Sequence, residues 1–402
     1  MNKTIFLTFI FVLSTMFTFS QIADTSNNQY LNSAEMMLNY NGKLGIGGYG
    51  EVHYNQPISN DIKESGTVDV HRMVMFLGYN FSKKTQFVSE IEFEYAKELW
   101  VEQVFLQHKI HKFVNFRAGL MLVPMGIINE YHEPTTFNGV ERPVIDNKLS
   151  LSTWREIGLG FTGNIYPASL KYQVYIMNGL SSYDGKGIFN GSQALREGRL
   201  KGSKAYVNSP SYTGKIEYYG IKNLNIGFSA YFGESQSKLH SKLHNDSANL
   251  KLKADSSVVG ISMLGIDARY HFKGLEVRGQ LNYTSFSNTE QYNIFTRTTG
   301  KNNDLGKSML GYYIEAGYNV FRHFANIKEE LVPFVRYEYY NTHQSVDNIT
   351  VRNNSYKNTI ITTGLSFRLN KNSVIKADMQ FIKPESAIEY TETFNAGIGF
   401  MF

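Results

Sequence analysis

Hydrophobic and polar residues alternate along most of the chain, and the final nine residues, FNAGIGFMF, show the pattern most clearly. Phe394, Ala396, Ile398, Phe400 and Phe402 share one parity, whereas the residues between them are mostly small or polar. Because successive side chains of a strand point to opposite faces, this segment predicts a strand with one apolar face. The ends of soluble domains usually fray into water, so an aromatic final residue favours a face that meets another medium.

The same alternation recurs from residue 43 to the end of the chain and leaves little helical pattern. In residues 85–95, for example, Ile91 and Phe93 oppose Glu92 and Glu94. The pattern predicts about sixteen strands, of which the second and fourth alternate poorly. We place them at residues 43–55, 67–81, 85–95, 100–110, 113–122, 154–163, 168–178, 211–219, 223–233, 258–272, 274–286, 309–321, 330–341, 356–369, 373–383 and 390–402.

The connections tend to alternate between short turns, such as 82–84 and 220–222, and long loops, such as 123–153 and 180–210. Bacterial transmembrane barrels have short periplasmic turns, long external loops and an even number of strands. Open sheet edges are not tolerated in hydrocarbon, so the last strand must pair with the first. The sequence therefore predicts an all-β, transmembrane, antiparallel barrel, with the apolar parity facing lipid and the polar parity facing a water-filled lumen.

The start of the chain predicts export. Residues 1–20 contain a basic Lys3 and an apolar stretch and are followed by Gln21, which is typical of a cleaved signal peptide. After Gln21 no apolar run approaches the roughly 18 residues that a spanning helix needs. We interpret residues 21–42 as a periplasmic lead-in, with one short helical pattern near 33–38, and residues 43–402 as the barrel.

These features place the protein in the outer membrane of a Gram-negative bacterium, with outer-membrane lipid, lipopolysaccharide and the barrel assembly machinery as expected partners. Phe402 and Phe400 resemble the C-terminal signal by which outer-membrane barrels are recognised for insertion. The 27 Tyr and 28 Phe suit aromatic girdles at the membrane interfaces. The formal net charge of +5 implies no nucleic-acid partner, and the absence of Cys excludes disulfides and thiolate chemistry.

Three segments between residues 67 and 165 resemble the phosphate-selective porin O and P family. They are FRAGLMLVPMGI (116–127), ERPVI (141–145) and WREIGLGFTG (154–163), with Gly119, Pro124, Gly126, Glu141, Arg142, Arg155, Glu156 and Gly158 at the motif positions. The resemblance implies a sixteen-stranded, usually trimeric porin whose loop after the fifth strand folds into the lumen. Here that loop is residues 123–153, which we call the constriction loop.

The expected pore lining is mixed in charge. For the constriction we select Glu130, Glu133, Glu141, Arg142, Asp146 and Lys148, and for the lumen wall Arg117, Glu90, Glu92, Glu94, Lys171, Arg336, Glu338 and Lys376. A ring of one sign selects the opposite ion, whereas neighbouring opposite charges such as Arg336 and Glu338 neutralise one another. The phosphate selectivity that the family name implies is therefore not matched by an excess of basic residues, and the ion preference stays open.

Other motifs carry little functional weight. The stretch 45–50 satisfies G-x-G-x-x-G but is followed by a strand pattern rather than the helix that a dinucleotide site needs. The row of Glu90, Glu92 and Glu94 suits either a cation-binding patch or a wall paired with basic residues. The ten His show no zinc-binding motif, so no metal, cofactor or catalytic residue is assigned. Basic residues in 180–210 suit either attraction of anionic solutes or a solvated loop.

The sequence thus predicts a non-enzymatic porin for passive diffusion of small hydrophilic solutes or ions, with anions such as phosphate as one candidate class. Two alternatives stay open: a barrel enzyme acting on lipid, and a structural or secretion-associated barrel without an open pore. The solute, the oligomeric state and the openness of the lumen are not fixed by the sequence.

Overall fold

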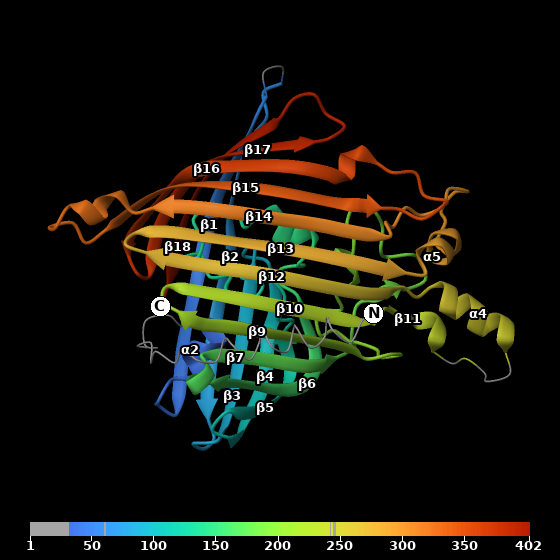
Figure 1. Cartoon of the computed structure of the whole chain (residues 1–402), viewed down its shortest axis with the longest axis horizontal. Helices are drawn as coiled ribbons and strands as arrows, with labels where there is room; N and C mark the ends of the chain where they lie inside the picture. Colours follow the sequence, from blue (N-terminus) through green and yellow to red (C-terminus); the bar gives the residue numbers. More distant parts are fainter. Residues whose placement is uncertain (1–31, 60–61, 242, 244–246) are drawn as a thin grey trace, which may run out of the picture.

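The computed structural model describes residues 32–402, except 60–61, 242 and 244–246, so the predicted signal peptide lies outside the described residues. Sixteen antiparallel strands form one closed barrel, which confirms the predicted fold class and strand number (Figure 1). They are β1 (Leu44–Ile58), β2 (Thr67–Asn80), β3 (Thr85–Glu94), β4 (Glu98–His111), β5 (Val114–Leu122), β6 (Arg155–Ile165), β7 (Leu170–Met177), β9 (Ser211–Ile221), β10 (Leu224–Glu234), β12 (Gly260–Phe272), β13 (Leu275–Ser287), β14 (Ser308–Tyr318), β15 (Glu330–Ser345), β16 (Lys357–Asn370), β17 (Ser373–Pro384) and β18 (Thr391–Met401).

The last strand closes the barrel on the first. β18 pairs with β1 in a register that places Tyr49 opposite Met401. Beyond β18 the pairing continues, because Phe402 N donates to Gly48 O at 2.8 Å and Gly48 N donates to Phe402 O at 2.9 Å. The aromatic end of the chain is therefore held by backbone hydrogen bonds, which a frayed terminus would lack.

The two faces of the wall separate by parity, as predicted. In β12, Ile266 is 52% exposed, whereas the neighbouring Asp267 is 1% exposed. In β18, Phe394, Ile398 and Phe400 face outward and Asn395 faces inward. An outer surface of this composition suits lipid, and the buried polar side chains fill the lumen.

The two ends of the barrel differ. Short turns such as 81–84, 112–113 and 273–274 join strands at the end where the chain terminates, and the longest connection there is 319–329. The opposite end carries α4 (Ala248–Ser256), α5 (Thr289–Phe295) and a small sheet of β8 (Ser181–Tyr183) and β11 (Gln236–Ser237) (Figure 1). The remaining short elements are the 3₁₀ turns η3 (Tyr166–Ala168), η4 (Arg196–Gly198), η5 (Lys238–His240), η6 (Val320–His323) and η7 (Asn354–Tyr356).

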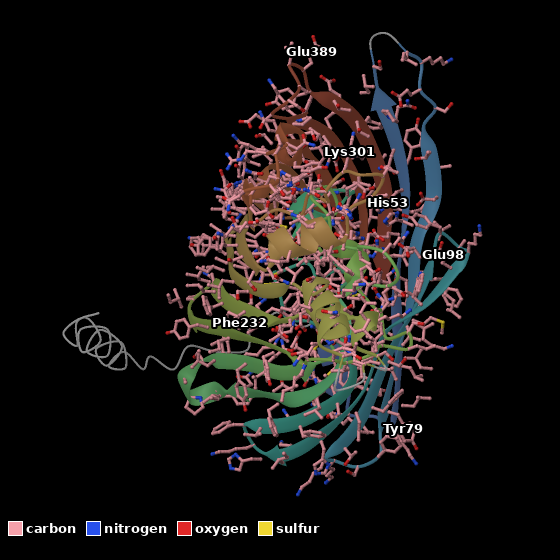
Figure 2. The ribbon with its side chains drawn as sticks, turned by 90° about the vertical axis from the view of Figure 1, so that its right-hand side faces the viewer. His53, Tyr79, Glu98, Phe232, Lys301 and Glu389 are labelled. Carbon is pink, nitrogen blue, oxygen red and sulfur yellow. The ribbon has the colours of Figure 1, made fainter. Side chains whose placement is uncertain are left out.

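Two segments occupy the lumen. The constriction loop, which contains the short helix α3 (Val144–Lys148), is buried along most of its length. Helix α2 (Ser33–Leu38), within the segment predicted as a lead-in, packs against β2 and β3. Figure 2, seen from the end that carries α4 and α5, shows the strands curving around an interior that is filled with side chains. Among the described residues, no helix is long and apolar enough to cross a membrane.

A lysine on the outer face should destabilise the barrel according to its depth. Ile266 lies at the middle of β12, so Ile266→Lys should lower the free energy of unfolding in lipid vesicles by about 2–4 kcal/mol. Phe272→Lys, at the end of the same strand, should lower it by about 1 kcal/mol or less. Denaturant titration in vesicles measures both values, and equal effects at the two positions would contradict the proposed outer face.

Candidate pore constriction

The constriction loop packs against small residues on the inner face of β18. A β-carbon added to Gly399 would lie 2.5 Å from Cβ of Pro134, and one added to Gly397 would lie 3.1 Å from Cγ1 of Val140. Larger side chains at either position would push the loop away from the wall. The small residues on the inner face of the C-terminal strand, which the sequence pattern already shows, therefore leave room for the loop to cross the lumen.

Wall side chains bind the backbone of the loop at several points. Gln280 accepts from Ile127 N at 2.7 Å, Asp378 accepts from Val140 N at 2.7 Å, and Glu338 accepts from Ile145 N at 3.2 Å. Lys215 and Lys376 donate to Gly126 O at 2.8 Å and to Gly139 O at 2.9 Å. Because these bonds come from β9, β13, β15 and β17, the loop is fixed across the lumen rather than along one side.

The predicted constriction residues divide into two groups. Glu141, Arg142 and Lys148 line a cavity of about 470 Å³ on the side of the long loops. Glu130, Glu133 and Asp146 are buried. Glu130 pairs with Lys215 at 2.9 Å, Glu133 accepts from Ser33 N at 2.7 Å, and Asp146 accepts from Gln280 at 2.9 Å. The buried group therefore holds the loop in place, and the first group faces the water-accessible space.

The predicted wall residues are also divided. Glu92 and Glu94 line the outer cavity, whereas Glu90 is fully buried. The other wall residues have partners inside the lumen. Arg117 donates to Gln107 and Tyr175, and Lys171 pairs with Glu35 and Glu217. Arg336 pairs with Glu315 and Glu338, and Lys376 Nζ lies 3.8 Å from the ring centroid of Phe137. The three glutamates of this row therefore differ in their surroundings, because two of them reach the outer cavity and one does not.

The outer cavity carries balanced charge. Its carboxylates are Glu51, Glu92, Glu94 and Glu141, and its basic residues are Arg72, Arg142, Lys148 and Arg196, with His53 and His71 beside them. Arg72 pairs with Glu51 at 2.7 Å. Burial alone would raise the pKa of Glu141, but the hydrogen bond with His53 and the charge of that imidazole lower it to about 2. Glu141 is therefore ionised at neutral pH.

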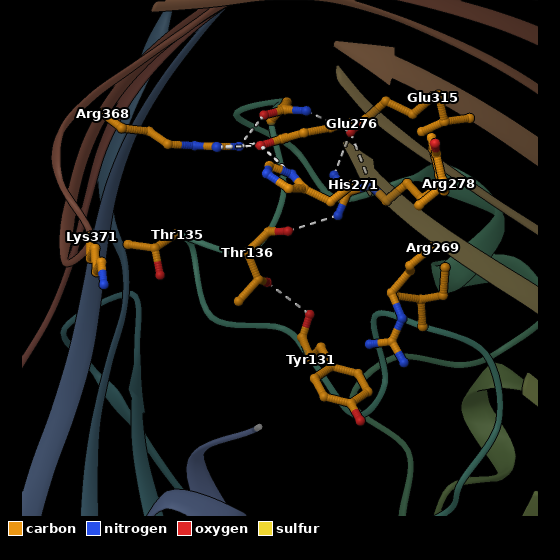
Figure 3. Close-up of a pocket in the computed structure, with 14 residues that line it drawn as sticks. Tyr131, Thr135, Thr136, Arg269, His271, Glu276, Arg278, Glu315, Arg368 and Lys371 are labelled. Atoms are coloured by element: carbon orange, nitrogen blue, oxygen red, sulfur yellow. Dashed lines mark hydrogen bonds and ion pairs between the residues drawn. The ribbon is translucent and has the colours of Figure 1, made fainter. Parts of the chain in front are cut away.

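The inner end of the lumen is more basic. A cavity of about 610 Å³ is lined by Arg269, Arg278, Arg368 and Lys371 against Glu276 and Glu315 (Figure 3). Arg368 binds Glu276 at 2.8 Å, and Arg278 donates to Thr136 O of the constriction loop at 2.8 Å. A second inner cavity, of about 550 Å³, is lined by Lys83, Lys109 and Lys112 and by no carboxylate among its described residues.

Sequence reasoning missed part of this lining. His53 falls on the predicted lumen parity of β1, so its inward direction was readable, but its contact with Glu141 joins residues 88 positions apart. Lys83 and Lys112 lie in turns, where parity gives no direction. Arg196 and Arg199, in the basic external loop, donate to Ser152 O at 2.9 Å and 3.0 Å and so bind the constriction loop.

Comparisons with known proteins support the porin fold and no finer class. No family model matches the chain. An uncharacterized protein of Aquifex aeolicus (strain VF5) is 31% identical over 347 residues, which cover 83% of this chain and 74% of that protein. The resemblance to phosphate-selective porins is therefore supported only at the level of a porin-like barrel of sixteen strands.

Three solved structures share the fold at low identity. Salmonella typhi OmpF, in complex with daunomycin, has a TM-score of 0.57 and 11% identity, covering 89% of this chain and 97% of that chain. An anion-selective porin from Comamonas acidovorans has a TM-score of 0.55 and 11% identity, covering 89% and 99%. OmpT of Vibrio cholerae, in a trimer form, has a TM-score of 0.51 and 9% identity, covering 90% and 100%.

The buried carboxyl group of Asp146 should make the stability of the loop depend on pH. Burial raises the pKa of Asp146 to about 7, although hydrogen bonds from Gln280 and Ser150 oppose the rise. Between about pH 4 and 7 the folded protein keeps a proton that the unfolded chain has lost, so stability falls as pH rises, by at most about 1.4 kcal/mol per pH unit.

Asp146→Asn keeps an oxygen that can accept from Gln280 and removes the titrating group, so it should abolish this dependence. Unfolding midpoints in denaturant at pH 5, 6 and 7 measure the effect. Asp184→Asn, in an exposed external loop, should leave the wild-type slope unchanged. An Asp146→Asn variant with the same pH slope as the wild type would contradict the assignment.

Proposed function

The chain belongs to the same family as the Aquifex aeolicus protein, and from its barrel and lumen we propose that it is an outer-membrane porin. It would form a channel through which small hydrophilic solutes or ions diffuse passively in a Gram-negative outer membrane. The observation that carries this proposal is a closed barrel with an apolar outer face, a charged lumen and water-accessible cavities at both ends of an inward-folded loop.

The narrowest part of the route is proposed to lie at residues 138–141 of the constriction loop. Asn138 lines the inner cavity of about 610 Å³, and Glu141 lines the outer cavity of about 470 Å³. These neighbouring parts of the loop therefore form the partition between the two cavities. A solute would pass this partition beside Glu141 and Arg142. The contacts of Glu141 with His53 and of Arg142 with Glu51 would therefore set the width of the opening.

Anions are the proposed preferred class, with phosphate as the finer candidate that the motif resemblance suggests. The support is the lining of the inner cavities, where Lys83, Lys109 and Lys112 have no carboxylate beside them among the described lining residues. Fixed positive charge raises the local concentration of anions. The balanced outer cavity would weaken this preference, so the channel should discriminate modestly between ions.

A second function is favoured by one observation. The inner and outer cavities share no lining residue among those described, so the constriction loop separates them in this conformation. That arrangement also suits a structural or secretion-associated barrel with a closed lumen. No catalytic role is proposed. As further proposals, the protein contacts lipopolysaccharide, is inserted by the barrel assembly machinery through the signal at Phe400 and Phe402, and forms a homotrimer.

Planar-bilayer recording separates these functions. A porin should give steady, ohmic single-channel conductance, whereas a closed barrel should give none. In a salt gradient the wild-type reversal potential should indicate a modest anion preference, and Arg142→Ala should change both the conductance and that preference because Arg142 lines the outer cavity. Absence of conductance from correctly folded protein would contradict the porin.

The inner lysines are tested in the same recordings. Replacing Lys83, Lys109 and Lys112 with Gln should lower the anion-to-cation permeability ratio by about twofold, because the inner cavity loses its fixed charge. The matched control replaces Lys251, Lys253 and Lys301 with Gln. These lysines are exposed on the long external loops, so the permeability ratio should stay unchanged. Equal effects of the two triple variants would show that net charge, not the inner lining, sets the preference.

A further inference from the structure

A cluster of two carboxylates and one imidazole is buried where the constriction loop meets the wall. Glu90 comes from β3, Glu102 from β4 and His132 from the loop, and each is fully buried. One potential ligand atom from each residue lies within 4.8 Å of the other two. The three side chains come from separate segments, so the cluster forms only when the loop is folded into the lumen.

The polar atoms of this cluster are poorly satisfied. Within the described part of the chain, Glu90 Oε2, both carboxylate oxygens of Glu102 and His132 Nε2 make no hydrogen bond of ordinary geometry. The nearest approach between His132 and Glu102 is 3.5 Å, longer than the about 2.7–2.9 Å of a charge-assisted hydrogen bond. Leaving such groups buried without partners is costly.

The remaining contacts orient these atoms toward a common point. His132 Nδ1 lies 3.3 Å from Asn129 O, and because a carbonyl oxygen only accepts, Nδ1 must carry the proton. When the ring loses its second proton to bind a metal, the lone pair is on Nε2, which is the nitrogen facing Glu102. Ser33 Oγ donates to Glu90 Oε1 and leaves Oε2 available. A ligating imidazole that donates its other nitrogen to a backbone carbonyl is the usual arrangement around metals.

We propose that Glu90, Glu102 and His132 bind a divalent transition-metal ion of the Zn²⁺ class, which fastens the constriction loop to the barrel wall. Two carboxylates and a neutral imidazole balance a charge of +2, so the ion neutralises charges that are otherwise buried together. Ligands held about 2 Å from a tetrahedral ion lie roughly 3–4 Å apart, so small side-chain rotations complete the site. Glu133, which accepts from Ser33 N at 2.7 Å, lies beside it as a further carboxylate.

A second cluster, of His53, His71 and Glu141, is the appropriate control site. Its ligand atoms also lie within 4.8 Å of one another. Its imidazole rings are stacked at 4.2 Å with an interplanar angle of 12°, so their lone pairs lie in nearly parallel planes and do not point at one common ion. Each ring is also already close to a carboxylate, His53 to Glu141 at 3.1 Å and His71 to Asp69 at 3.3 Å. This cluster should therefore bind metal weakly.

The test measures metal binding by the whole barrel and does not depend on conductance. Protein refolded with Zn²⁺, dialysed and analysed by elemental mass spectrometry should retain one ion per chain. Glu102→Gln preserves side-chain size, and His132→Asn keeps an amide N–H that can replace the Nδ1 donor in a smaller side chain. Each should weaken Zn²⁺ binding by at least about 100-fold. The double variant His71→Asn, Glu141→Gln should retain the ion. Zn²⁺ should also raise the unfolding temperature of the wild type and of the control, but not of Glu102→Gln.

The heat-dependent electrophoretic mobility of each variant shows whether it has folded. If either Glu102→Gln or His132→Asn misfolds, the other variant is used for the test. Wild-type protein that retains no Zn²⁺ above the level of Glu102→Gln would overturn the proposal and indicate that Glu90 and Glu102 share a proton instead. Loss of Zn²⁺ in the His71→Asn, Glu141→Gln variant alone would overturn it by placing the ion in the other cluster. The metal-site proposal does not depend on the porin function. A barrel that binds Zn²⁺ but does not conduct would contradict the porin function and still support the metal site.

Discussion

Backbone pairing between the first and last strands is the interaction on which the rest of the structure depends. Hydrocarbon offers no partner for an exposed N–H or C=O group, so a sheet of this size is stable in a membrane only when it is closed. The register of β1 on β18 supplies the closure, and the hydrogen bonds between Gly48 and Phe402 extend it to the final residue. Closure also fixes which parity faces outward and therefore where every polar side chain must go.

The lumen follows from that constraint. Charged side chains that cannot face lipid are brought together inside, where each needs a partner of opposite charge or a hydrogen bond. The constriction loop supplies many of these partners, for example Glu130 for Lys215 and the carbonyl of Gly139 for Lys376. Internal charges are thus paired either with one another, as Arg368 is with Glu276, or with the loop, and we propose that ion preference depends on the charged groups that line the cavities. Glu141 and Arg142 are among the residues that line the outer cavity, and Lys83, Lys109 and Lys112 are among those that line the second inner cavity.

The strands and their faces could be predicted from the sequence because a period of two is a local property. Strands β2 and β4 alternate poorly in the sequence, but the turns on either side of each segment were enough to place them. The closure on Phe402 also followed from pattern alone. The position of the constriction loop was expected from the resemblance to porins, not from its own residues.

The directions of individual loop side chains could not be predicted. Glu133 and Asp146 look like Glu141 in the sequence, yet they are buried against Ser33 and Gln280. These contacts join residues 100 and 134 positions apart, and no local pattern encodes them. For the same reason the meeting of Glu90, Glu102 and His132 was invisible before the loop was placed. Parity showed that Glu90 faces the lumen, but not what it meets there.

The central claim is that one parity of the wall meets lipid and the other meets the lumen, and spin labelling tests it most directly. The chain has no cysteine, so single cysteines can be introduced without background and labelled with a nitroxide. In lipid vesicles, labels along residues 262–270 of β12 should alternate, with high oxygen accessibility at Leu264, Ile266 and Ala268 and low accessibility between them. Uniform accessibility along the strand, or alternation in the opposite phase, would contradict the account.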